Sequence, residues 1–349
     1  MKILSMDGGI AAALNLRLLR HLEAQRPGFL AGIDLLAGAS DGALMSLFLA
    51  SRLGPDHAGN LRAVTDCIDF FHEVLGVFQL TGKTALRFAT GRGPRALAAD
   101  LERVFERHLG RETLGGLAAR GKRALVVAVD RQTWKRQTFK SFDLGPGADR
   151  GRTLVDLALS CSAFPVVLPA HRSEADGRAY LDGALITNNP ALVAVREALA
   201  HLTAAGGGGG DRLGEITLLS LGATESSEHR GEGPRPGLLG WLPGTLDRLG
   251  FAGWTQLLSR ALYLPDFLIQ GSVDIIDLQC ADLLGPRYRR VRPPIPELDY
   301  LASIALPPDR LRRRLDEEAA RWLRPDLPEL EWASARWLGD PAASAPAAG

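Results

Sequence analysis

The sequence predicts an α/β protein with a mostly parallel central sheet. An apolar strand over Ile3–Met6 ends at a glycine turn, and leucines at helical spacing follow until Pro27. A second apolar strand over Ile33–Ala37 ends at another glycine turn and leads into the apolar helical run Ala43–Leu53. This order of strand, helix, strand and helix predicts parallel neighbours whose turns lie at the same edge of the sheet.

The alternation of strands and helices continues along the chain. We expect strands at Lys122–Asp130, near Gln137–Phe142, at Ala179–Leu181 and at Ile216–Leu221. We expect helices over most of 60–109, over Thr153–Ala163, over Pro190–Leu202 and, after a change of pattern beyond Gly222, over Asp309–Trp322.

The composition is typical of a globular protein with a sizeable core. The chain has 349 residues, of which 46% are hydrophobic and 23% charged, and its formal net charge is +1. This length allows one large domain or two small ones. Because the charge is nearly balanced, we expect no nucleic-acid partner.

Cysteine usage and hydropathy bear on the compartment. Cys67, Cys161 and Cys280 are odd in number and widely spaced, which fits neither a disulfide framework nor a zinc site and favours a reducing compartment. Asp41 and Asp156 interrupt the two most apolar stretches, so we expect no transmembrane segment. Any contact with a membrane would be at its surface.

Ser40 is the candidate nucleophile. Gly38-Ala39-Ser40-Asp41-Gly42 has the GxSxG form of a nucleophile elbow, in which a serine occupies a tight turn from strand to helix. The flanking glycines remove Cβ atoms that would clash in such a turn. An isolated match has little weight, but its place between a strand and a helix favours a catalytic serine over a structural turn.

Asp182 is the candidate base. It follows a short apolar strand and opens the turn Asp182-Gly183-Ala184, where partial burial would raise its pKa and closeness to the serine would supply effective concentration. The residues alone leave two alternatives open. One is an Asp-Gly turn without a chemical role. The other is an α/β-hydrolase triad with His201 or His229, which the early position of the serine disfavours.

Three motifs together resemble those of the patatin-like phospholipase family. In the family's order and spacing they are Ile3-Leu4-Ser5-Met6-Asp7-Gly8-Gly9, Gly38-Ala39-Ser40-Asp41-Gly42 and Asp182-Gly183-Ala184. Leu157–Pro165 and Leu218–Gly222 are similar to two further stretches of the family. The resemblance extends over about residues 1–225.

The resemblance implies a three-layer α/β/α patatin-like fold with a mostly parallel central sheet. The change of pattern beyond Gly222 adds the expectation of a helical C-terminal extension. The expected parts are a catalytic domain at 1–225, a helical C-terminal part packed on the same domain at 226–338, and a disordered tail at 339–349. The implied activity is that of a serine carboxylic ester hydrolase, of phospholipase A or lysophospholipase type. It uses a dyad of Ser40 and Asp182 without metal or other cofactor.

The resemblance also implies an oxyanion hole made by backbone N–H groups. The implied donors are Gly8, Gly9, Ile10 and Asp41, and the motif glycines are Gly38, Gly42 and Gly183. The first turn departs from the family pattern, which usually continues with a third glycine, an arginine and another glycine. Ile10, Ala12 and Ala13 stand there instead.

Because of this departure, two alternatives stay open beside the hydrolase. One is a weak or inactive patatin-fold binding protein, and the other is a hydrolase activated by an unknown partner or ligand. The expected substrate is a lipid, and the expected place is the cytoplasm with peripheral contact at the inner membrane surface. The apolar stretch Leu238–Leu258 could form a lid or pack in the core. The arginines of Arg287–Arg292 fit a solvated edge strand better than a site for lipid phosphates.

Overall fold

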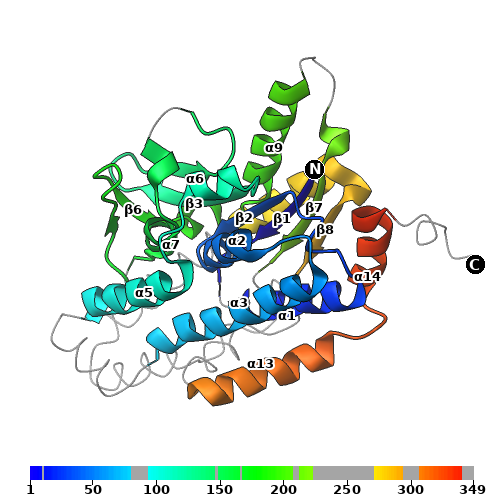
Figure 1. Cartoon of the computed structure of the whole chain (residues 1–349), viewed down its shortest axis with the longest axis horizontal. Helices are drawn as coiled ribbons and strands as arrows, with labels where there is room; N and C mark the ends of the chain where they lie inside the picture. The colour runs from blue at the N-terminus through cyan, green and yellow to red at the C-terminus, as the bar shows by residue number, and fades with distance from the viewer. Residues whose placement is uncertain are drawn as a thin grey trace, which may run out of the picture.

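The computed structural model describes residues 1–9, 12–79, 93–145, 148–165, 167–206, 212–222, 271–293 and 306–339. A single sheet runs through the middle of the molecule, and helices cover both of its faces (Figure 1). The N-terminal strand lies inside this sheet, and the helices near the C-terminus pack back against the N-terminal part of the chain.

The described residues contribute eight strands to the sheet. They are β1 (Lys2–Met6), β2 (Leu35–Ala39), β3 (Ala124–Asp130), β4 (Lys135–Lys140), β5 (His171–Arg172), β6 (Ala179–Asp182), β7 (Thr217–Leu221) and β8 (Tyr288–Val291). Their order is β5-β6-β3-β2-β1-β7-β8, with β4 paired to β3. The neighbours from β3 through β2, β1 and β7 to β8 are parallel, whereas β4, β5 and β6 pair antiparallel. The expected mostly parallel sheet is confirmed.

The helices form a layer on each face of the sheet. They are α1 (Ala12–Gln25), α2 (Asp41–Arg52), α3 (His57–Val77), α5 (Gly93–Leu109), α6 (Leu114–Ala119), α7 (Leu154–Ser162), α8 (Ala184–Thr187), α9 (Ala191–Gly206), α13 (Pro308–Trp322) and α14 (Pro328–Trp332). Short turns of other helix types are η1 (Ala148–Gly151), η2 (Leu213–Glu215), η3 (Gly285–Arg287) and η4 (Ala333–Leu338). Residues 271–284 are helical as well.

Side chains that alternate along the strands supply two separate cores. On β1, Ile3 points into the core under α9, and Leu4 points into the core shared with α1, α2, α3, α5 and α7. On β3, Val127 and Val126 divide in the same way. Because both faces of the central strands β1, β2, β3 and β7 are buried, these strands are mostly apolar, which is typical of a parallel sheet. The fold class predicted from the sequence is therefore confirmed.

The bounds of one strand and one helix differ by one or two residues from those predicted from the sequence. The strand predicted at Ile33–Ala37 runs over β2 instead, because parallel pairing with β1 begins at Leu35 and continues to Gly38. The helix predicted at Thr153–Ala163 is α7, and the Thr153 side chain accepts the Asp156 N–H as its N-cap.

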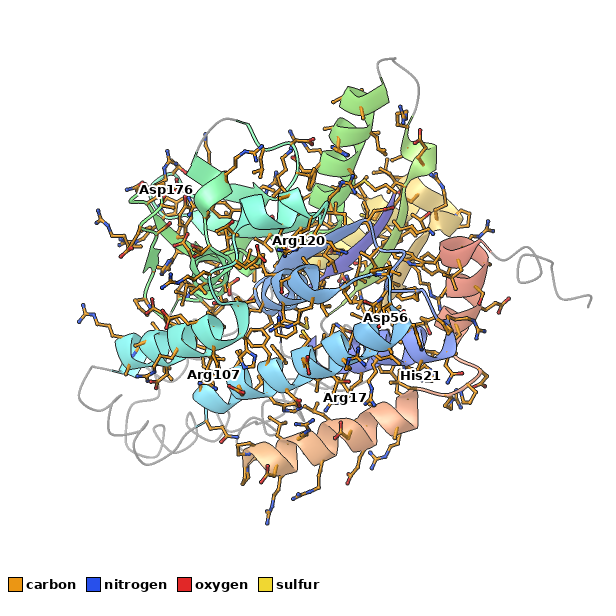
Figure 2. The ribbon with its side chains drawn as sticks, in the orientation of Figure 1. Arg17, His21, Asp56, Arg107, Arg120 and Asp176 are labelled. Carbon is orange, nitrogen blue, oxygen red and sulfur yellow. The ribbon has the colours of Figure 1, made fainter. Side chains whose placement is uncertain are left out.

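The C-terminal part adds a strand to the sheet as well as helices. β8 pairs in parallel with β7 and is the last strand on that side of the sheet among the residues that the structure describes. On α1, Arg17 points toward α13, where its Nε donates to Asp316 Oδ1 at 2.7 Å (Figure 2). Trp337 of η4 is fully buried, stacks on Phe29 at a centroid distance of 5.1 Å, and donates its indole N–H to the Phe29 carbonyl oxygen at 3.0 Å.

Other expectations concern cysteines, membranes and two segments of the chain. The three cysteines are free and buried. Within the described ranges, no helix has the length and apolarity needed to cross a bilayer. The apolar stretch Leu238–Leu258 and residues 340–349 of the expected tail lie outside the described residues.

We expect Trp337→Ala to lower the free energy of unfolding by about 3–5 kcal/mol, because it removes a buried aromatic side chain and its hydrogen bond. Urea unfolding followed by circular dichroism measures the change. Leu338→Ala is the matched control, since Leu338 is 38% exposed and should change stability by no more than about 0.5 kcal/mol. A separate early transition in Trp337→Ala, with the main transition unmoved, would contradict packing of the C-terminal part on the same core.

Candidate functional site

Ser40 lies at the turn between β2 and α2. Its φ of 50° and ψ of −125° form a combination that residues with a side chain strongly disfavour. The Ser40 carbonyl oxygen accepts the N–H groups of Ala43 and Leu44, so the first turn of α2 is fixed directly behind the serine. A strained serine between a strand and a helix is the conformation of a nucleophile elbow.

Glycine is required at three positions around Ser40, because other backbone atoms lie too close to leave room for a Cβ. A Cβ on Gly38 would lie 2.2 Å from the Gly42 carbonyl oxygen, and a Cβ on Gly42 would lie 2.1 Å from the Met6 carbonyl oxygen. A Cβ on Gly183 would lie 2.2 Å from the Val127 carbonyl oxygen. This backbone accepts only glycine at the three positions, which is the physical reason for the motif.

Ser40 contacts Asp182, 142 positions away in the sequence, because the strands that precede them share one edge of β3. β4 pairs along one edge of β3. β2 occupies the other edge as far as Ala39, which lies opposite Val127. β6 then occupies the same edge, with Asp182 opposite Ala128, the next residue of β3. The ends of β2 and β6 therefore meet, and the residue after Ala39 faces the last residue of β6.

The two predicted catalytic residues are in direct contact. Ser40 Oγ donates to Asp182 Oδ2 at 2.7 Å. The other carboxylate oxygen of Asp182 accepts the Ala184 N–H at 2.8 Å, and the Asp182 N–H donates to the Ala163 carbonyl oxygen at 3.1 Å. Asp182 is 1% exposed. Its carboxylate is thus held with one oxygen on the backbone and the other on the serine hydroxyl.

Burial changes the acidity of two carboxyl groups at this site. The pKa of Asp182 is raised to about 7, because burial and, to a smaller extent, the Asp41 charge raise it more than the hydrogen bonds from Ser40 and Ala184 lower it. Burial raises the pKa of Asp41 to about 6, against the effect of the Gly9 N–H. A carboxylate with a pKa near neutrality accepts a proton from serine more readily than an ordinary aspartate does.

The N–H groups expected to form the oxyanion hole differ in the hydrogen bonds that they make in the structure. The Gly8 N–H donates to the Asn188 carbonyl oxygen at 3.3 Å. The Gly9 N–H is directed at the Asp41 carboxylate, and Gly9 has a φ of 114°, which favours glycine. Ile10 lies outside the described residues. The Asp41 N–H, at the N-terminus of α2, has no acceptor among the residues that the structure describes.

An ion pair next to the first glycine turn is not evident from the sequence. Arg290 Nη1 donates to Asp7 Oδ1 at 2.9 Å, and Arg290 Nη2 donates to Asp7 Oδ2 at 2.5 Å. Both side chains are buried. The only signal in the sequence is the arginine run at 287–292, which was predicted to be a solvated edge strand. The edge position is correct, but Arg290 is buried rather than solvated.

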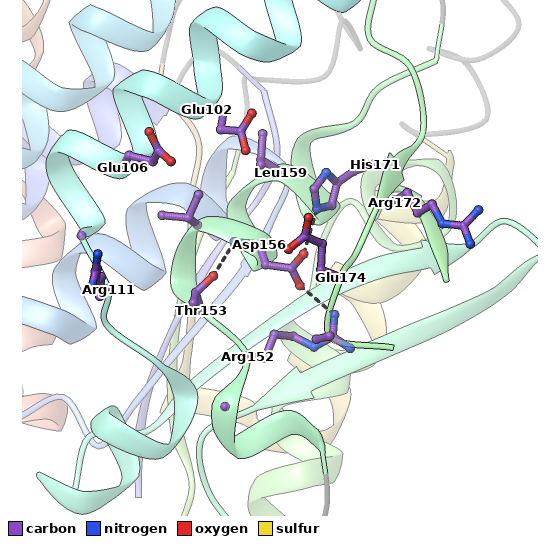
Figure 3. A pocket seen from close by; sticks show the side chains of 14 residues that line it. Glu102, Glu106, Arg111, Arg152, Thr153, Asp156, Leu159, His171, Arg172 and Glu174 are labelled. Carbon is purple, nitrogen blue, oxygen red and sulfur yellow. Dashed lines mark hydrogen bonds and ion pairs between the residues drawn. The ribbon is translucent and has the colours of Figure 1, made fainter. Parts of the chain in front are cut away.

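One surface pocket lies elsewhere. Its volume is about 560 Å³, and residues of α5, α7 and β5 line it, whereas Ser40 and Asp182 do not (Figure 3). Arg152 in this pocket donates to Asp156 Oδ2 at 2.8 Å, and His171 Nε2 lies 2.8 Å from Asp156 Oδ1. These groups pair with one another at the N-terminal end of α7. In the described ranges, no three His, Cys, Asp or Glu side chains are grouped so that they could hold a metal ion.

Comparisons with known proteins identify a family and two similar proteins. A family model described as patatin-like phospholipase matches residues 4–195. Patatin-like protein 2 of Arabidopsis thaliana is 26% identical over 274 residues, which cover 69% of this chain and 65% of the plant protein. The crystal structure of VipD from Legionella pneumophila aligns with a TM-score of 0.37 and 16% identity, over 66% of this chain and 51% of VipD. The chain therefore spans slightly less than two thirds of the plant relative's length.

We expect Ser40→Gly to be more stable than Ser40→Ala by about 1 kcal/mol. Both variants remove the hydroxyl, so the difference between them reports the backbone at φ 50°. Glycine relieves about 1–3 kcal/mol of strain, and its greater freedom in the unfolded chain offsets about 0.5–1 kcal/mol.

Chemical denaturation of both variants measures this difference. The matched control is the pair Ser46→Gly and Ser46→Ala in the interior of α2, where alanine should be the more stable by about 1 kcal/mol. Greater stability of the alanine variant at both positions would mean that Ser40 is not strained.

Proposed function

Because this chain belongs to the patatin-like phospholipase family, we propose that it is a lipid acyl hydrolase in which Ser40 is the nucleophile and Asp182 the general base. The observation that carries the proposal is the 2.7 Å hydrogen bond from Ser40 Oγ to Asp182 Oδ2, at the family's motif positions. Within this class, we propose the phospholipase A or lysophospholipase type, which cleaves carboxylic esters of membrane lipids.

The first half of the reaction transfers the acyl group to the serine. As Ser40 Oγ attacks the ester carbonyl carbon, its proton moves to Asp182 Oδ2. The tetrahedral intermediate carries the negative charge on the former carbonyl oxygen. When it collapses, the bond to the alcohol breaks, and the protonated carboxyl of Asp182 gives its proton to the leaving alkoxide. The products are an acyl-serine and a free alcohol.

The second half of the reaction releases the fatty acid. Asp182, ionised again, accepts a proton from a water molecule that attacks the acyl-serine. Collapse of the second tetrahedral intermediate breaks the bond to Ser40 Oγ, which recovers its proton from Asp182. The Ala184 N–H holds the other oxygen of the carboxylate, so the same oxygen serves both steps.

Charge on the tetrahedral intermediate needs N–H donors close to Ser40. The Asp41 N–H at the start of α2 is one, since it follows the nucleophile and benefits from the helix dipole. The turn after β1, at Gly8 and Gly9, lies against Ser40, because a Cβ on Gly8 would be 2.5 Å from Ser40 Cβ. We propose that Gly9 and Ile10 of this turn supply further donors once a substrate is bound.

The remaining proposals concern organisation and location. We propose that residues 1–225 form the catalytic part and that 226–338 pack on the same domain, a view supported by the pairing of β7 with β8. Contact with the inner face of a membrane would bring the lipid to Ser40, and it is a proposal that follows from the substrate class.

We expect Ser40→Ala and Asp182→Asn each to lower kcat by at least about a thousandfold. The first variant removes the nucleophile, and the second removes the general base that accepts its proton. The assay is hydrolysis of a short-chain chromogenic ester and of phospholipid vesicles labelled separately at the two acyl positions. Ser46→Ala is the matched control, since Ser46 is buried in the same helix and its hydroxyl has no partner among the described residues.

The outcomes of this assay separate the proposals. Activity that survives in Ser40→Ala would remove Ser40 as the nucleophile. A folded wild-type protein without activity on any ester would favour a binding protein or a hydrolase that needs an activator. Vesicles cleaved at one acyl position, together with lysophospholipid hydrolysis, would define the type of phospholipase.

We expect kcat/KM to rise with pH through a midpoint near 7, because Asp182 acts as a base only when it is ionised and its pKa is about 7. Asp41→Asn should move the midpoint to lower pH, because the Asp41 charge raises the pKa of Asp182. Asp66→Asn is the control, since Asp66 is exposed on α3 and should leave the midpoint in place. An unchanged midpoint in Asp41→Asn would mean that the interaction between Asp41 and Asp182 does not set the pH dependence of kcat/KM.

A further inference from the structure

We infer that Arg290 of β8 is a positioning residue. Through Asp7, it holds in place the glycine turn after β1, at Gly8 and Gly9, which is proposed to supply oxyanion donors. This inference rests on the proposed hydrolase function. Arg290 lies outside the region matched by the family model, which ends at residue 195, and it comes to the site from the edge strand of the sheet.

Asp7 joins the turn to the sheet. It is the first residue after β1 and immediately precedes Gly8 and Gly9. Its N–H donates to the Leu221 carbonyl oxygen at 3.0 Å, which continues the pairing of β1 with β7 by one residue. Its side chain is 1% exposed. The position of Asp7 therefore sets where the next two N–H groups lie relative to Ser40.

Arg290 fixes the Asp7 side chain from two strands away. Its guanidinium makes the bidentate contact with both Asp7 oxygens, and Nη1 also donates to Ser220 Oγ at 2.7 Å. Ser220 lies opposite Arg290 in the pairing of β7 with β8. A planar guanidinium that grips a carboxylate with two hydrogen bonds fixes direction as well as distance.

Gly222, at the end of β7, leaves room for the contact between Arg290 and Asp7. A Cβ on Gly222 would lie 2.7 Å from Arg290 Nη2, so a side chain at this position would push the guanidinium away from the place where it contacts Asp7. The Gly222 N–H donates to the Val291 carbonyl oxygen at 2.7 Å, and its carbonyl oxygen accepts from Asn15 Nδ2 at 2.8 Å. The end of β7 is thus tied to β8 on one side and to α1 on the other, directly beside Asp7.

The electrostatics of the pair agree with a positioning role. Burial raises the pKa of Asp7, and the charge and hydrogen bonds of Arg290 oppose this rise. Burial lowers the pKa of Arg290, but the charge and hydrogen bonds of Asp7, together with the charges of Tyr288 and Asp277, hold that pKa above its ordinary value. Removing the guanidinium alone would leave a buried carboxylate without its cation, a situation that a chain relieves by shifting or by taking up a proton.

The test compares Arg290→Met, Arg290→Lys and the double variant Asp7→Asn/Arg290→Met. We expect Arg290→Met to lower kcat on a soluble ester by about 10²-fold, the size of losing one oxyanion donor, with KM changed less than about threefold. Inhibition by an alkyl trifluoromethyl ketone should weaken in parallel with kcat, because its adduct with Ser40 carries an oxyanion. Arg290→Lys and the double variant should each recover part of the loss.

Arg289→Met is the matched control on the same strand. Arg289 pairs with Glu329 at 2.6 Å, away from the turn, so its loss should change stability but keep kcat within about twofold. Assays run well below the melting temperature of every variant. Equal losses of kcat in Arg289→Met and Arg290→Met, or a loss in Arg290→Met confined to KM, would overturn the positioning role.

A second readout does not depend on catalysis. Amide hydrogen exchange of the segment that contains Asp7 and Gly8, measured by mass spectrometry, should be at least about tenfold faster in Arg290→Met than in wild type or Arg289→Met. If the wild-type protein hydrolyses no ester, the proposed function fails, and exchange still decides whether Arg290 holds the turn. Unchanged exchange in Arg290→Met would overturn the inference.

Discussion

The division of one edge of β3 between two strands is the constraint on which the candidate site depends. β2 leaves this edge where the chain turns into α2, and β6 arrives from the opposite direction at the next residue. No loop has to be folded over the sheet to bring Ser40 to Asp182. The geometry of both residues comes from backbone pairing in the interior of the sheet, which is the most rigid part of such a fold.

The rest of the site consists of close backbone contacts around this junction. The turn after β2 lies so close to the end of β1 that Gly42 meets the Met6 carbonyl oxygen, and Gly8 lies against Ser40. The ends of β1, β2 and β6 are therefore packed as one unit. A change at any of them is transmitted to Ser40 through main-chain atoms, which adjust less readily than side chains.

Much of the fold, and Ser40 and Asp182 as separate candidates, could be predicted from the sequence, because the signals for them are local. Apolar strands followed by glycine turns predict a parallel sheet, and the glycines at positions 38 and 42 mark contacts that no other residue tolerates. The pairing of Ser40 with Asp182 required the family resemblance, since no local pattern records which strands share an edge. The ion pair of Asp7 with Arg290 could not be predicted, because it joins residues 283 positions apart and the arginine run resembles an ordinary edge strand.

The high pKa of Asp182 links the chemistry of the site to the stability of the whole fold. Its pKa rises from 3.8 to about 7 on burial, so between these values the folded chain keeps a proton that the unfolded chain releases. The stabilisation from this proton is complete at acidic pH and is lost as the pH rises through about 7, where the carboxylate ionises inside the protein. The ionised form, which the proposed mechanism requires, is thus the form that the fold tolerates least. A bound ligand that donates a hydrogen bond to this carboxylate would return part of the lost stability, so occupancy of the site and folding are thermodynamically coupled.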